Sequence, residues 1–229
     1  MGRMRLLVVA AILIAGVFAA TAGEVLFSGL GNGYGWNDGA YYTGYVTLGF
    51  DGKDYAGLCV DALHDTYGNS WDAVYVPLTD AADLTAVMQA YFNITDPSVY
   101  MPKLIADMTG WAELSDVGSN ETANNNIQHD VWAQFAPGAY TDTDQLFQLA
   151  QTVAPNGYGS IPSHAGGQIP INLNEFGLLV DANYAQGGQL EQAFLVDGRP
   201  TVPEPSSLLL AGTALLGLVL LWSRSRKRV

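Results

Sequence analysis

The chain is poor in cysteine and in histidine. Cys59 is the only cysteine among 229 residues. A single cysteine excludes an internal disulfide, so in an exported protein the thiol must pair with another molecule, serve a function or be buried. The three histidines, His64, His129 and His164, are scattered and lack the spacing of metal ligands. The sequence therefore predicts neither a metal site nor a cofactor.

Basic residues are almost absent from the body of the chain. All 22 Asp and Glu lie between Glu24 and Glu204, whereas only Lys53, Lys103 and Arg199 of the 9 Lys and Arg do, which leaves a net charge of −19. Phosphate groups are bound mainly through Lys and Arg, so this deficit argues against nucleic acid and anionic lipid as partners. Residues 51–54 also lack the carboxylate spacing of a calcium-binding EF-hand loop.

The N-terminal end has the order of a secretory signal peptide. Arg3 and Arg5 precede an apolar run at residues 6–20, and Ala20-Thr21-Ala22 supplies small residues for cleavage. The sequence predicts a signal peptide over residues 1–22. An uncleaved anchor is the alternative, although the apolar run is shorter than the roughly 20 residues that span a bilayer.

The C-terminal end has three parts. The motif Pro203-Glu204-Pro205 precedes an apolar stretch at 208–222, and a basic cluster at 224–228 would hold that end in the cytoplasm. This order resembles the PEP-CTERM sorting signal, with an ordinary tail anchor as the alternative. The resemblance implies recognition by an exosortase after the secretion machinery, a transient inner-membrane anchor formed by a transmembrane helix at 208–222, and final release to the cell surface or extracellular space.

The remaining body of about 180 residues is long enough for one domain with its own core. We expect this domain at residues 23–192, a tether at 193–202 and the sorting signal at 203–229. Residues 29–44, rich in Gly, Tyr and Asn, and residues 155–167, rich in Gly, Pro and Ser, are predicted to be loops.

Hydrophobic periodicity predicts strands at both ends of this domain and helices between them. Residues 41–50 and 55–60 alternate around the hairpin signal Asp51-Gly52, which places Cys59 on the second strand. Further strands are expected at 73–77, 168–172, 176–182 and 192–196. Helices are expected from Thr79 or Asp80, at 102–114, around Gln128, and from Asp142 or Thr143.

This order predicts an α+β fold. We expect an antiparallel β framework, barrel or sandwich-like, with an inserted helical subdomain, flanked by an N-terminal signal helix and a C-terminal transmembrane helix. In the third helix, Val131, Trp132 and Phe135 follow Gln128 at offsets of three, four and seven, so the glutamine shares the apolar face. A buried carboxamide with an unpaired polar atom costs about 1–3 kcal/mol. Attack by a cysteine sulfur, with loss of ammonia, would remove that problem.

Two segments resemble those of the bacterial thioester domains found in surface adhesins. Leu58-Cys59-Val60-Asp61 fills the first motif of that family, and Gln128 with Val131 and Trp132 fills the second. Members usually carry Thr before the Gln and Ala two residues after it, whereas this chain has Ile127 and Asp130. An acidic side chain there would either disturb a buried thioester or point to solvent from the opposite face of the helix.

The resemblance implies a Cys59–Gln128 thioester that waits until an amine on a surface protein or polysaccharide attacks the Gln128 acyl carbon. The product is an amide crosslink with a free Cys59 thiol, so the protein would be a single-turnover crosslinker and no enzyme. Trp132 is expected to exclude water, and Asp61 or His129 are candidates to move protons. The plainer interpretations are that Asp61 caps a strand end and that His129 is exposed.

Two other functions remain open at this stage. A Cys-His hydrolase would pair Cys59 with one of the three histidines, but a cysteine in a strand among acidic residues is expected to have a raised pKa. A non-catalytic structural or carbohydrate-associated matrix protein would bury Cys59 as a small apolar residue and Gln128 as a hydrogen-bonded amide, with its tyrosines available to contact sugars.

Overall fold

The structure, a computed structural model, describes residues 23–37, 41–65, 69–163, 165–186 and 188–198. These residues belong to one compact unit that spans residues 22–200. The predicted signal peptide at 1–22, the sorting motif Pro203-Glu204-Pro205 and the predicted transmembrane helix at 208–222 lie outside the described residues. Within the described ranges, no helix has the length and apolar character needed to cross a membrane.

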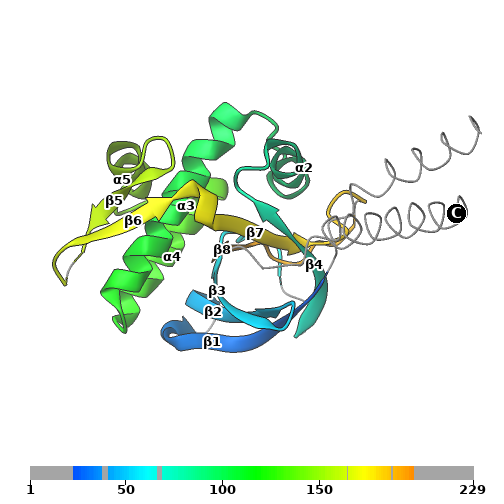
Figure 1. Cartoon of the computed structure of the whole chain (residues 1–229), viewed down its shortest axis with the longest axis horizontal. Helices are drawn as coiled ribbons and strands as arrows, with labels where there is room; N and C mark the ends of the chain where they lie inside the picture. Colours follow the sequence, from blue (N-terminus) through cyan, green and yellow to red (C-terminus); the bar gives the residue numbers. More distant parts are fainter. Residues whose placement is uncertain (1–22, 38–40, 66–68, 164, 187, 199–229) are drawn as a thin grey trace, which may run out of the picture. The chain divides into compact units, whose positions relative to one another are not determined.

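Six antiparallel strands close into a barrel (Figure 1). The strand order is β1-β2-β3-β8-β7-β4, and pairing between β1 and β4 closes the ring. This confirms the predicted α+β class and, of the two frameworks considered, selects the barrel. The strands are β1 (Gly23–Asn37), β2 (Tyr42–Phe50), β3 (Lys53–Cys59), β4 (Ser70–Pro77), β7 (Phe176–Asp181) and β8 (Phe194–Asp197).

The predicted hairpin between β2 and β3 is confirmed. Asp51 and Gly52 both have positive φ, at 50° and 73°, as a two-residue hairpin turn of the mirror-image type requires. The turn sets the register in which Tyr45 lies opposite Leu58. Cys59 is therefore the last residue of β3, where it pairs with Phe194 of β8.

Four helices and a small hairpin are inserted between β4 and β7 (Figure 1). Asp80 caps the first helix as predicted, by accepting hydrogen bonds from two backbone N–H groups. The second helix begins at Pro97 rather than near residue 102, because Asp96 caps it and proline suits the first turn of a helix. The inserted elements are α2 (Ala81–Phe92), α3 (Pro97–Val117), α4 (Glu121–Phe135), α5 (Leu146–Val153), β5 (Tyr158–Pro162), β6 (Gln168–Asn172) and the short 3-10 helix η1 (Leu173–Glu175).

Two predicted loops are wrong over part of their length. β1 extends through the glycine-rich sequence to Asn37 and pairs with β2, with two register shifts along the way. β5 lies inside the second predicted loop and pairs with β6. In both segments the backbone pairs although the side chains do not alternate in hydrophobicity, so periodicity could not identify the strands.

The predicted tether at 193–202 is also wrong at its start. β8 covers Phe194–Asp197 and is a central member of the barrel, paired with both β3 and β7. The strand expected at 192–196 is thus confirmed, and the domain extends to at least Asp197. The rest of the tether lies outside the described residues from residue 199 onward.

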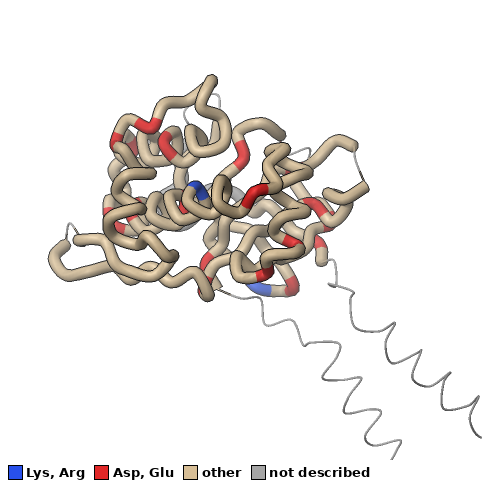
Figure 2. The backbone as a smooth tube through the Cα atoms, turned by 90° about the horizontal axis from the view of Figure 1, so that it is seen from above, with Lys and Arg blue, Asp and Glu red and all other residues tan. Residues whose placement is uncertain are grey.

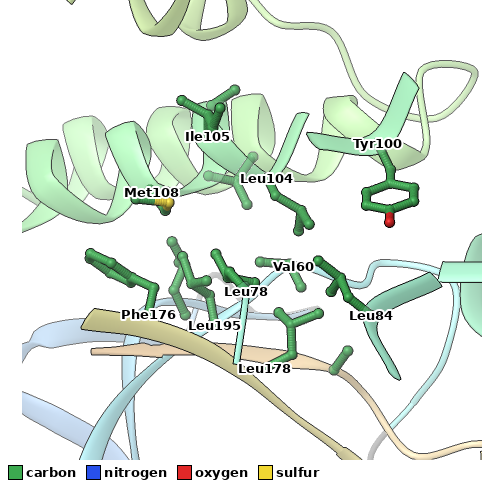
Figure 3. Packing of buried hydrophobic residues seen from close by; sticks show 14 of the residues in the cluster. Val60, Leu78, Leu84, Tyr100, Leu104, Ile105, Met108, Phe176, Leu178 and Leu195 are labelled. Atoms are coloured by element: carbon green, nitrogen blue, oxygen red, sulfur yellow. The ribbon is translucent and has the colours of Figure 1, made fainter. Parts of the chain in front are cut away.

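The largest hydrophobic cluster lies between α3 and the barrel. Leu104 and Met108 of α3 face Val60 and Leu78, which directly follow β3 and β4, and the strand residues Leu178 and Leu195 (Figure 3). A second cluster is built mainly from strand side chains and includes Cys59 and, from α4, Trp132. Because α4 contributes to both clusters, its face that points to the barrel is fixed by packing on two sides.

Acidic residues are spread over the described part of the chain (Figure 2). Lys53 and Lys103 are the Lys and Arg residues that fall within the described ranges. Lys103 is partly buried: its Nζ hydrogen-bonds to Gln134 O and lies 5.4 Å from the centre of the Phe135 ring. The surface is therefore strongly negative, as expected from the sequence.

Candidate functional site

The fold brings Gln128 to the end of β3. Gln128 Nε2 donates a hydrogen bond to Cys59 O over 2.7 Å, and Gly44 N donates to Gln128 Oε1 over 3.2 Å. The side chain is fully buried, as the helical periodicity predicted. One carboxamide thus connects α4 to the neighbouring strands β2 and β3, and the two motifs of the sequence meet in space.

Local structure on both sides positions this carboxamide. Asn120 caps α4 by accepting a hydrogen bond from Ala123 N, which sets the start of the helix two turns before Gln128. Gly44 has φ of 75°, a conformation that glycine adopts easily, and this lets its N–H point at the helix. Thr43 Oγ1 also hydrogen-bonds to Asn125 Oδ1. These contacts hold α4 against the start of β2.

Cys59 is a buried free thiol, with 4% of its surface exposed. Its Sγ–H donates to Asp61 O over 3.2 Å. Burial, followed by the nearby Asp61 carboxylate, raises the pKa of the thiol to about 12. The sulfur is therefore protonated at neutral pH and is a poor nucleophile toward molecules in solution.

Asp61 organises the segment that follows β3. Its buried carboxylate accepts a hydrogen bond from Leu63 N over 2.9 Å, and its Oδ2 lies 2.6 Å from His64 Nδ1. This hydrogen bond to Asp61 is the main reason why the pKa of His64 is raised. Asp61 thus ends the strand with a turn, as the plainer interpretation proposed. Its own backbone oxygen accepts the hydrogen bond from the Cys59 thiol.

A cleft of about 480 Å³ opens beside Cys59. Cys59 and Trp132 lie on its wall, together with aromatic and polar residues from the barrel strands and the loops between them. Trp132, which is 2% exposed, packs against the rings of Tyr41, His129 and Tyr140, with ring centres 5.6, 5.7 and 5.0 Å away. Besides Cys59 and Trp132, the residues that line the cleft are Phe27, Tyr41, Tyr42, Val46, Asp65, Asn69, Gln192 and Phe194.

Two buried polar side chains close to Cys59 have no hydrogen-bond partner within the described part of the chain. They are the indole N–H of Trp132 and the carboxyl group of Asp107 on α3. Burial holds the pKa of Asp107 well above its usual range, which favours the protonated carboxyl. A negative charge on Asp107 would raise the pKa of Cys59 further, whereas the Trp132 indole lowers it.

The two departures from the thioester-domain pattern have a packing explanation. Ile127 is buried in the main core, next to Gly110 of α3. Asp130 neither faces Gln128 nor points to solvent: it is 1% exposed and accepts hydrogen bonds from Thr143 N, Thr143 Oγ1 and Asp144 N. The expected conflict between Asp130 and the site is therefore absent, because the carboxylate fastens the loop before α5.

The histidines do not form a catalytic group with the thiol in the described residues. His64 is held by Asp61, and its ring packs against Tyr91. His129 is half-buried rather than exposed, and it stacks on Trp132. His164 lies outside the described residues. No group of three or more His, Cys, Asp or Glu in the described ranges is arranged to hold a metal ion.

Sequence reasoning missed two residues of this site. Gly44 gives no signal in the sequence, because it is one of many glycines in the stretch at 29–44. Asp107 does give one: it lies among Leu104, Ile105 and Met108 on the predicted apolar face of α3, where a carboxyl group is unusual.

The C-terminal end matches a known sorting motif. Residues 201–227 match the PEP-CTERM protein-sorting motif. The resemblance carried by Pro203, Glu204 and Pro205 is thereby confirmed. The motif supports export of the chain, recognition by an exosortase during membrane-associated sorting, and delivery as a surface protein.

Comparison with known proteins adds nothing for the barrel and its helices. No curated protein and no solved structure matches the chain. The match to the sorting motif begins after the last described strand. The function of the body is therefore inferred from its own residues.

Proposed function

We propose that the exported body forms an internal thioester between Cys59 and Gln128 and uses it to attach covalently to amine-bearing targets on a surface. The observation that carries the proposal is the 2.7 Å hydrogen bond from Gln128 Nε2 to Cys59 O. It ties the carboxamide to the residue that bears the sulfur, and both side chains are buried. Asp61, Val131 and Trp132 support the site by holding the β3 end, the helix face and the cleft wall.

Formation of the bond needs no external reactant. The Cys59 sulfur adds to the Gln128 side-chain carbonyl carbon, the bond from that carbon to nitrogen breaks, and the thiol proton leaves with the nitrogen as ammonia. The neutral state of the thiol is compatible with this step, because the proton is needed on the leaving group. Ammonia then leaves the site, and its dilution in the surrounding solution favours the thioester.

In the reaction with a target, nitrogen is the nucleophile and the Cys59 sulfur is the leaving group. A primary amine attacks the Gln128 acyl carbon, an amide forms, and Cys59 leaves as a thiol. Even with its pKa raised to about 12, the Cys59 thiol is far more acidic than an amide N–H, so sulfur is the better leaving group and the amide product does not revert. Each molecule reacts once, so we propose that the chain is no enzyme. An amine-bearing protein or polysaccharide could approach through the cleft on which Cys59 lies.

A second candidate function rests on the same hydrogen bonds. Gln128 is paired to Cys59 O and to Gly44 N without any covalent bond, so the carboxamide also suits a purely structural role that fastens α4 to the barrel. In that case the aromatic cleft fits a non-catalytic matrix protein that contacts carbohydrate. A Cys-His hydrolase has less support, because the thiol pKa is raised and the described histidines have other partners.

The intact mass of the body, produced without the two terminal signals, separates these functions. The thioester predicts a mass lower by one ammonia than the sequence requires, and addition of one methylamine after treatment with that amine. Cys59→Ala should abolish both effects. Gln134→Ala is a matched control, because Gln134 is a buried glutamine on the same helix whose Nε2 bonds to Asp130 O. A full mass in the unsubstituted chain, with a thiol that reacts only after unfolding, would favour the structural role.

A further inference from the structure

Packing alone does not explain the indole N–H of Trp132. The side chain is 2% exposed, and its Nε1 has no hydrogen-bond partner within the described ranges. A buried donor left unpaired destabilises a fold by about 1–3 kcal/mol. A phenylalanine would fill much of the same space at no such cost, so the N–H needs a reason to be there.

The unpaired N–H lies close to the sulfur. Trp132 and Cys59 line the same cleft, and hydrogen bonding from the indole toward the sulfur lowers the pKa of the thiol against the larger effects of burial and Asp61. It nevertheless makes no hydrogen bond of normal geometry to the neutral thiol. A charged sulfur is a much stronger acceptor than a thiol, so the N–H is suited to a state in which the sulfur carries negative charge.

The other groups that act on this sulfur disfavour such a charge. Asp61, two residues along the chain, raises the thiol pKa through its carboxylate, and a charge on Asp107 from α3 would do the same. A backbone hydrogen bond at Asp61 lowers the thiol pKa. The hydrogen bond that the thiol donates to Asp61 O belongs to the neutral form only, because a thiolate has no proton to donate. Trp132 is thus the side chain in the described site that favours the ionised sulfur.

We propose that Trp132 stabilises the sulfur of Cys59 as it leaves, an inference that rests on the thioester proposed above. When the amine attacks, the bond from the Gln128 acyl carbon to nitrogen forms and the bond to sulfur breaks, and its electron pair goes to sulfur. The indole N–H donates to this developing thiolate. The nitrogen, which is positively charged once it has bonded to the acyl carbon, then loses a proton, and this proton neutralises the sulfur to give the thiol. Trp132 is therefore a catalytic residue of the opening step as well as a wall of the cleft.

Trp132→Phe tests this role, and Trp71→Phe is its matched control. Trp71 is also buried with an unpaired Nε1 in the same hydrophobic cluster, but it packs on Phe194 at 5.9 Å and does not line the cleft. We expect Trp132→Phe to form the thioester, seen as loss of one ammonia, and to react with methylamine on the order of 10- to 100-fold more slowly. Trp71→Phe should react at the unsubstituted rate.

The sign of the effect separates catalysis from packing. If Trp132 only excluded water, the smaller ring would open the site, and both methylamine addition and hydrolysis would become faster. A rate equal to or higher than that of the unsubstituted chain would therefore overturn the proposal.

A second measurement separates failure of this inference from failure of the thioester. Should the unsubstituted chain keep its full mass, the indole N–H resonance of Trp132 is compared between that chain and Cys59→Ala. A shift confined to Trp132, absent at Trp71, supports contact with the sulfur. An unchanged Trp132 resonance overturns that contact whether or not a thioester exists.

Discussion

The carboxamide of Gln128 donates to the backbone oxygen of Cys59 across 69 positions of sequence. One residue ends a barrel strand and the other lies midway along the third inserted helix. Their contact is therefore a product of the whole fold, because it needs the helical insertion to return onto the barrel. Several consequences of this arrangement can be measured.

Replacing Gln128 should destabilise the domain more than replacing a comparable glutamine. In a Cys59→Ala background, where the carboxamide stays intact, Gln128→Ala removes the partner of Gly44 N–H and of the backbone oxygen of residue 59, and each buried group left unpaired costs about 1–3 kcal/mol. Gln134→Ala removes one bond, to Asp130 O within the same helix. Urea unfolding monitored by tryptophan fluorescence should rank the two variants in this order. Equal losses would mean that the Gln128 bonds add little to stability.

The pair formed by Asp61 and His64 should make stability depend on pH. The pKa of His64 is higher in the folded than in the unfolded protein, mainly through its hydrogen bond to Asp61. Protonated His64 therefore stabilises the folded state fully at pH values below the pKa of histidine in the unfolded chain, about 6.5. This stabilisation is lost as the pH rises through the pKa of His64 in the folded protein. Unfolding free energies between pH 5 and about 9 should show this loss in the unsubstituted chain. His64→Gln should flatten the profile, and a profile that keeps its slope would contradict the assignment.

Asp107 should destabilise the domain increasingly as the pH rises. Complete burial raises the pKa of Asp107 in the folded state. The same carboxyl ionises at lower pH in the unfolded chain, and above that pH its ionisation favours the unfolded state. Asp107→Asn removes this ionisable group and keeps the shape of the side chain. We expect the variant to gain stability over the unsubstituted chain at pH 8 and much less at pH 4. A difference that is the same at both pH values would show that Asp107 does not titrate as inferred.

Asp130 should matter for folding and not for chemistry. Asp130→Ala removes the acceptor for Thr143 N, Thr143 Oγ1 and Asp144 N, so the loop before α5 should loosen and the unfolding free energy should fall. Faster amide hydrogen exchange at Thr143 and Asp144 would report this loosening. The variant should still lose ammonia as the unsubstituted chain is expected to do. Loss of that mass change in a folded variant would place Asp130 in the site after all.

Local signals in the sequence predicted much of this fold. The Asp51-Gly52 turn set the β2–β3 hairpin, and the apolar spacing around Gln128 placed its side chain inward. Each depends on residues a few positions apart, where turn chemistry and periodicity act directly. The α+β class followed from the order of these elements.

Long-range pairing accounts for what the sequence did not reveal. Closure of the barrel depends on β1 lying beside β4, and the glycine-rich end of β1 is a strand only because β2 is there to pair with it. The Gly44 N–H that completes the carboxamide contacts is likewise visible only in three dimensions. The site residues Cys59 and Gln128 were identified through a resemblance to short motifs, and their proximity required the fold.

The most direct test of the proposed thioester is peptide mapping under mildly acidic conditions that preserve thioesters. We predict that the peptides containing Cys59 and Gln128 will be recovered as one linked species, lighter by one ammonia than their sum, which methylamine separates into two. Recovery of two separate peptides, with Cys59 fully alkylated after unfolding and Gln128 as an intact carboxamide, would contradict it.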